Sequence, residues 1–113
     1  MNTVAGNYLV VNEVEGSEMK VDFLHVKKAA LILRAMNHKL RQQIMKLLEE
    51  SDKLTVTEIY VRLRLEQSVA SQHLAILRRA GIVKTERDGK FIYYKLNEPR
   101  IIEISRCVEE IIS

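Results

Sequence analysis

The chain has 113 residues, of which 47% are hydrophobic and 29% are charged. This length and balance are typical of one folded domain and argue against a disordered chain. No stretch approaches the roughly 18 apolar residues of a membrane-spanning helix, and the N-terminus lacks the basic region of a signal peptide. Because Cys107 is the single cysteine, no intramolecular disulfide can form, and we expect a cytoplasmic protein with no membrane partner.

Charge is distributed unevenly along the chain. Residues 61–96 hold eight basic and three acidic residues, whereas residues 1–26 hold one basic and four acidic residues. Basic surface gathered in one segment is typical of a protein that binds a polyanion such as nucleic acid. A solvated basic face without a partner would have the same charge, so charge alone leaves both interpretations open.

The N-terminal part is expected to differ from the rest. Residues 1–18 are interpreted as an arm that lies on the body of the protein or on a partner chain, with Tyr8–Val11 as a short strand. From about Glu18 to Met36 the apolar residues follow helical spacing, which predicts a helix covered on more than one side. Residues 19–113 are expected to fold as a single domain.

Two further helices are predicted before the middle of the chain. The first covers residues 37–50 and has Asn37 as its expected N-cap. The second covers residues 55–65, and either Thr55 or Thr57 could cap it. A short polar break is expected between the two helices.

The next segment is predicted to complete a helix-turn-helix motif. It covers residues 67–80, directs Ala70, Leu74 and Leu77 inward, and ends at Gly81. Only about three residues separate this helix from the one before it, which is the spacing of a helix-turn-helix. In this motif the second helix lies in the major groove of DNA, where side chains near its N-terminus reach base edges.

A change of hydrophobic period from helical to two predicts a β-hairpin over residues 82–96. Asp88-Gly89 is expected to form a two-residue type I′ turn, which places Arg87 directly opposite Lys90. Like charges that face each other destabilise a hairpin. We therefore interpret this pair as a contact to phosphate or to the minor groove, and the hairpin as the wing of a winged helix.

The outward residues of the second motif helix and of the hairpin form the predicted DNA-binding set. Serine and glutamine can bond to base edges, and arginine and lysine suit phosphates. The same residues could also be ordinary polar surface. The predicted contact residues are Gln67, Ser68, Ser71, Gln72, His73, Arg78, Arg79, Arg87 and Lys90.

The chain is expected to end in a helix that begins at Asn97-Glu98-Pro99. Its apolar residues are spaced like a coiled-coil seam, which favours pairing with a partner helix, although the seam could pack back on its own domain. The predicted homodimer interface comprises Val21, Leu24, Ile101, Ile104, Val108 and Ile111. The predicted fold is mainly α with a small β-hairpin, in the order helix-helix-helix-helix-hairpin-helix: a dimeric winged helix-turn-helix.

From about Leu33 to Ile112 the chain resembles the ArsR/SmtB family of bacterial winged-helix repressors. The similar segments are residues 33–48 and 54–96. Within the second, QSVASQHLAILRRAGIV is similar to the family's recognition helix, and the Asp-Gly wing and the Tyr-Tyr strand also match. The resemblance implies a homodimer with the first and last helices at the interface, and repression of a promoter that an effector relieves.

The sequence departs from the family's metal-sensing members. Where those members carry cysteines before the recognition helix, this chain has Thr55 and Thr57, and hydroxyls are poor ligands for thiophilic ions. A second family site on the last helix would fall near Arg100 and Ile111, and redox members pair two cysteines where this chain has Cys107 alone. No ligand-like spacing joins the histidines, which are His25, His38 and His73. We expect no metal, no cofactor and no catalytic site.

Two alternatives to a DNA-binding regulator stay open at this point. A winged helix can serve as a protein–protein interaction module, although such a module has no need for a net charge of +5 over residues 61–96. An atypical metal or redox sensor could use Cys107, which is expected to be a buried thiol. The favoured interpretation is a non-enzymatic, homodimeric repressor that binds an inverted-repeat operator in double-stranded DNA, with an effector still to be identified.

Overall fold

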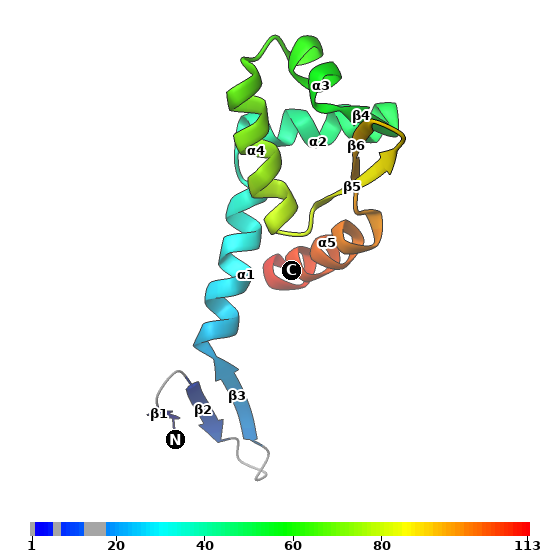
Figure 1. Ribbon diagram of the computed structural model, residues 1–113. Helices are drawn as coiled ribbons and strands as arrows, with labels where there is room; N and C mark the ends of the chain where they lie inside the picture. The colour runs from blue at the N-terminus through cyan, green and yellow to red at the C-terminus, as the bar shows by residue number, and fades with distance from the viewer. Residues whose placement is uncertain (1, 6–7, 13–17) are drawn as a thin grey trace. The chain divides into compact units, whose positions relative to one another are not determined.

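The computed structural model describes the backbone of residues 2–5, 8–12 and 18–113, and the side chains from Val21 onward. Two compact units make up the chain, residues 1–34 and residues 35–113 (Figure 1). Among the described residues, none of the helices has the length and apolar character needed to cross a membrane.

The first unit holds a three-stranded antiparallel sheet and most of helix α1 (Phe23–Met36). Its strands, in sheet order, are β1 (Asn2–Ala5), β2 (Tyr8–Asn12) and β3 (Glu18–Asp22). The strand predicted at Tyr8–Val11 is therefore confirmed. Other parts of the predicted arm, residues 1, 6–7 and 13–17, lie outside the described residues.

The predicted start of the first helix at Glu18 is wrong. Residues 18–22 pair with β2 along their whole length, and their apolar and polar residues alternate with the period of a strand. The helix begins only after Asp22, whose carboxylate accepts a hydrogen bond from the backbone N–H of Leu24 at 2.9 Å. Such an N-cap bond satisfies a donor that the first turn leaves unpaired.

The second unit contains the predicted succession of helices and hairpin, with one strand added. Its further elements are α2 (Lys39–Ser51), β4 (Lys53–Thr55), α3 (Val56–Leu63), α4 (Gln67–Arg79), β5 (Val83–Asp88), β6 (Phe91–Leu96) and α5 (Glu98–Ile112). The additional strand is β4, which lies at the edge of a sheet in the order β4-β6-β5. Its central residue Leu54 is buried, so the expected polar break ends in a strand that contributes to the core.

The cap of α2 differs from the prediction. Asn37 was expected to cap this helix, but the N-cap is His38, whose Nδ1 accepts a hydrogen bond from the backbone N–H of Leu40 at 3.1 Å. The Nδ1 atom of histidine lies as many bonds from Cβ as the side-chain oxygen of asparagine, so it can reach the same donor.

The cap of α3 is Thr55, one of the two threonines predicted for this role. Its Oγ1 accepts a hydrogen bond from the backbone N–H of Glu58 at 3.2 Å, and a Glu58 carboxylate oxygen accepts from the backbone N–H of Thr55 at 3.1 Å. These reciprocal bonds form a capping box. The backbone bond from Thr55 lowers the pKa of Glu58 below its usual value.

The core of the second unit is apolar and draws on each of its helices and on its sheet. The three residues of α4 that were predicted to point inward are all fully buried, which confirms that prediction. Burial of each leucine contributes roughly 1.5–3 kcal/mol. The buried residues of this unit are Ala35, Arg41, Ile44, Leu48, Leu54, Ile59, Ala70, Leu74, Leu77, Ile82, Val83 and Ile104.

We predict that Thr55→Ala lowers the free energy of unfolding by about 1 kcal/mol, because the substitution leaves the Glu58 N–H without its cap. Urea unfolding of the purified variants measures this change. Thr57→Ala is the matched control, since Thr57 is exposed on the same helix and its loss should change stability by less than about 0.5 kcal/mol. Equal effects of the two substitutions would contradict the assignment of the cap.

Candidate nucleic-acid interface

The end of α4 fixes the path of the chain from this helix into the wing. Gly81 has a φ of +76°, and its N–H donates to the carbonyl of Arg78 while the N–H of Ile82 donates to the carbonyl of Leu77, both at 3.0 Å. This is the Schellman arrangement, which confirms the predicted stop at Gly81. Asn97 donates from Nδ2 to the Gly81 carbonyl at 3.0 Å, so the start of α5 holds the same turn.

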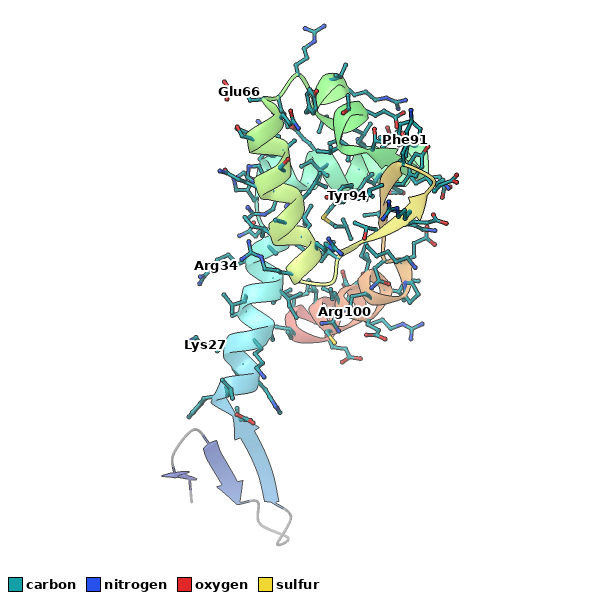
Figure 2. All side chains as sticks on the ribbon, in the orientation of Figure 1. Lys27, Arg34, Glu66, Phe91, Tyr94 and Arg100 are labelled. Carbon is teal, nitrogen blue, oxygen red and sulfur yellow. The ribbon has the colours of Figure 1, made fainter. Side chains whose placement is uncertain are left out.

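The outer face of α4 is polar and basic. Glu66, labelled in Figure 2, is the N-cap that precedes this helix. Six of the predicted contact residues on α4 are exposed, whereas His73 is half-buried and faces α2. The exposed residues are Gln67, Ser68, Ser71, Gln72, Arg78 and Arg79.

A shallow depression lies between α4 and the wing. Ser71, Ala75, Arg78 and Arg79 line it from α4, and Tyr94, which is labelled in Figure 2, lines it from β6. Tyr94 is not among the contact residues predicted from the sequence. The alternation of β6 could have indicated it, because this residue shares a face with the buried end of the hairpin.

The hairpin is confirmed, but its turn is not the predicted one. Asp88 pairs with Phe91, so the two loop residues are Gly89 and Lys90. Gly89 has a φ of +62° and Lys90 is not among the residues with positive φ, which is the pattern of a type II′ turn. Arg87 therefore faces Ile92 instead of Lys90, and the predicted clash of like charges does not occur.

The observed register has a physical advantage over the predicted one. It pairs every residue of β5 with a residue of β6, and it sets the buried Val83 opposite Leu96 at the base of the wing. The predicted register would leave the last two residues of β6 without partners on β5. More of the backbone N–H and C=O groups are therefore paired in the observed hairpin.

The tip of the wing is exposed and basic. Arg87 donates from Nε to the Gly89 carbonyl at 3.2 Å, and Lys90 Nζ lies 5.4 Å from the ring centroid of Phe91. Phe91, labelled in Figure 2, is 48% exposed. On the same sheet, Lys53 Nζ lies 3.5 Å from a carboxylate oxygen of Glu86, a contact that joins β4 to the wing.

The turn between α3 and α4 carries a strained basic residue that the sequence did not indicate. Arg64 has a φ of +56°, and the following N–H, that of Leu65, donates to the Tyr60 carbonyl at 2.9 Å. The left-handed region costs a non-glycine residue roughly 1–2 kcal/mol. Arg64 is exposed, so packing does not explain why an arginine stands where glycine would fit without strain.

The predicted dimer-interface residues have different environments within one chain. Ile104 is only 8% exposed, whereas Leu24 is 46% and Ile111 is 73% exposed. The α5 seam therefore packs on its own domain in the middle of the helix and is open to solvent at its end. The half-buried members of the set are Val21, which lies in β3 and not in a helix, Ile101 and Val108.

The cysteine and histidines show no converging arrangement. Cys107 is exposed, so the prediction of a buried thiol is wrong; it flanks the α5 seam and does not lie within it. His25 Nδ1 lies 3.4 Å from the Asp22 carboxylate, and His38 and His73 lie side by side. Among the described residues, no three His, Cys, Asp or Glu side chains are placed to hold a metal ion.

Comparison of the sequence with known proteins finds relatives that are transcriptional regulators. Residues 38–85 match the arsR family of bacterial regulatory proteins. An HTH-type transcriptional regulator of Methanocaldococcus jannaschii is 38% identical over 85 residues, which are 75% of this chain and 96% of the relative. The transcriptional activator HlyU of Vibrio cholerae is 40% identical over 74 residues, 66% of this chain and 68% of the relative.

A solved structure is similar as well. The crystal structure of the transcriptional repressor PagR of Bacillus anthracis is 33% identical, with a TM-score of 0.63, and the match covers 77% of this chain and 99% of that one. The chain belongs to the arsR family of winged helix-turn-helix proteins. It is a DNA-binding transcriptional regulator, and proteins of this family are generally not enzymes.

We predict that Arg64→Gly raises the free energy of unfolding by about 1 kcal/mol, because glycine adopts a positive φ without strain. Chemical denaturation measures the change. Lys46→Gly is the control: Lys46 is exposed in the middle of α2, where glycine costs about 1 kcal/mol. If both substitutions destabilise the protein alike, Arg64 is not strained.

Proposed function

We propose that the protein is a homodimeric repressor of the cytoplasm that binds an inverted-repeat operator in double-stranded DNA. In this proposal α4 lies in the major groove, and the β5–β6 hairpin contacts the flanking backbone as a wing. The observation that supports it most is the largely polar and basic outward face of α4, in a domain whose hairpin carries the exposed Arg87 and Lys90 at its tip. A fully buried opposite face holds that helix in place.

The residues on this face are assigned two kinds of contact. Ser71 and Gln72 are proposed to bond to base edges, because glutamine can pair with adenine through two hydrogen bonds and serine can donate or accept. Gln67 and Ser68 lie one turn earlier, where the helix N-terminus approaches the bases. The residues proposed to bind phosphates are Arg78, Arg79, Arg87 and Lys90.

The dimer is proposed from the apolar side chains that a single chain leaves in water. They include Ile111 on α5, which is the most exposed of the large hydrophobic residues described, and Leu24 on α1. A two-fold dimer would bury such residues and would present two recognition helices to one palindromic site. Repression is favoured over activation because a dimer that covers promoter DNA blocks transcription without touching the polymerase. A promoter–reporter fusion tests whether the protein represses or activates transcription.

We predict that substitutions on the helix and on the wing change DNA binding in different ways. Gln72→Ala should cost about 1–3 kcal/mol at the operator and relax sequence preference at one position of each half-site. Arg87→Ala should weaken binding to all duplexes alike and reduce the slope of log affinity against log salt by about one. Titration of a duplex selected from a random pool, and of a scrambled duplex, measures both effects.

The reverse pattern would show that the helix and the wing have been assigned each other's roles. Ser71→Ala and Lys90→Ala repeat the test with an independent residue on each element. Undetectable selection of any duplex at low salt would contradict the proposed function altogether.

We also predict that Ile111→Glu makes the protein monomeric. A charge at an apolar contact is costly to desolvate, and the exposure of Ile111 in one chain means that the fold itself should tolerate the change. Arg106→Glu is the control, because Arg106 is exposed on the opposite side of α5. Light scattering that finds Ile111→Glu still dimeric would place the interface elsewhere. Ile104 is unsuitable for this test, since its substitution would disturb the core of its own chain.

A further inference from the structure

His73 differs from its neighbours on α4 because it contacts α2. Arg41 of α2 is 8% exposed and donates from Nε to the carbonyl of Ala35 at 2.6 Å. Its Nη1 lies 3.3 Å from Nδ1 of His73. One guanidinium therefore joins the end of α1, the first turns of α2 and the helix proposed to read DNA.

The contact between Arg41 and His73 requires a neutral imidazole. A guanidinium can only donate hydrogen bonds and keeps its charge at any relevant pH. His73 Nδ1 must therefore accept, which places the ring proton on Nε2. The ring of His38 lies 4.8 Å from that of His73, and the Nδ1 atom of His38 accepts a hydrogen bond from the Leu40 N–H at 3.1 Å.

Low pH disfavours the neutral His73 ring that this contact requires. Burial lowers the pKa of His73 below its usual value, and the nearby charges of His38 and Arg41 lower it further. These two groups, both at the start of α2, are the ones whose charge acts on His73 among the described residues. Because the pKa is lower in the folded protein, the contact contributes its full stability above the ordinary histidine value of about 6.5 and loses it as the pH falls.

The position of His73 makes this bond suitable for setting the rotation of α4 about its axis. Leu74 and Leu77 hold the inner face of the helix by apolar burial, which has no direction of its own. A hydrogen bond is directional. His73 follows the outward Gln72 and precedes the buried Leu74, so a change in its contact shifts the outward residues relative to the rest of the domain.

We propose that His73 is a positioning residue that accepts a hydrogen bond from Arg41 and thereby sets the angle at which Ser71 and Gln72 meet the bases. Protonation of His73 breaks this bond, so selectivity for the operator falls in acid. The inference rests on the proposed role of α4 in reading DNA.

The test compares the full-length protein with His73→Asn and His73→Phe. Asparagine keeps an acceptor at the position of Nδ1 but does not titrate, whereas phenylalanine removes the acceptor. The readout is the affinity ratio between a duplex selected from a random pool at pH 7.5 and a scrambled duplex, at constant ionic strength from pH 5.5 to 8.0. A ratio cancels the general gain of DNA affinity that added positive charge brings in acid.

In the wild type the ratio should fall as the pH is lowered from 7.5 to 5.5, approaching a loss of about three- to tenfold as His73 becomes protonated, which is the size expected for one hydrogen bond. His73→Asn should keep the ratio at pH 7.5 within about twofold and lose its dependence on pH, and His73→Phe should be low at every pH. His25→Asn is the control, because His25 is exposed on α1, and it should behave as the wild type.

An unchanged pH profile in His73→Asn would overturn the proposal, and so would wild-type selectivity in His73→Phe. If His73→Phe does not fold, the comparison of His73→Asn with the wild type decides alone. If the wild type selects no duplex at any pH, the proposed function fails, and urea unfolding then judges the contact. In that case acid must destabilise the wild type more than His73→Asn, and equal destabilisation overturns the proposal.

Discussion

The geometry of the proposed DNA-binding surface depends on the burial of one face of α4. Ala70, Leu74 and Leu77 are each fully buried, and their spacing leaves the remaining sides of the helix to solvent. Because α4 packs against α2, α3 and β5 through this buried face, the polar side chains opposite it point away from the domain. The buried side chains of Ala70, Leu74 and Leu77 thus determine which side of α4 faces the solvent.

Directional bonds add precision to this apolar anchoring. The Schellman turn at Gly81 ends the helix, and Asn97 ties the same turn to α5. Arg41 joins the middle of the helix to α2 through His73. The helix is therefore held at its middle and at its C-terminal end, while the strained Arg64 precedes its N-terminal end.

Features that depend on local periodicity were predictable from the sequence. The apolar spacing in α4, the glycine after it and the threonine before α3 each act within a few residues, and each prediction was confirmed. The register of the wing was not predicted, because Asp88-Gly89 suits a type I′ turn whereas the ladder to Leu96 favours a type II′ turn at Gly89 and Lys90. Only the pairing of β5 with β6 along their whole length selects between the two turns.

Contacts between residues far apart in the sequence could not be predicted, for a related reason. β4 has three residues and forms only because β6, some forty residues later, offers it an edge. The position of His73 in the sequence places it next to the DNA-reading face of α4, but its ring contacts Arg41, which lies 32 positions earlier in the sequence. Neither contact leaves a pattern in the local sequence, and both bear on how the candidate interface is held.

Methylation interference tests most directly whether two copies of α4 read the major groove of one inverted repeat. Dimethyl sulfate modifies guanine N7 in the major groove and adenine N3 in the minor groove, so it reports which groove is occupied. We expect interference at guanines in two clusters that are related by two-fold symmetry. The centres of the two clusters should lie about 10 base pairs apart, which is one helical turn, or a whole multiple of that distance. Interference confined to the minor groove, or a single cluster without a symmetric partner, would contradict the account.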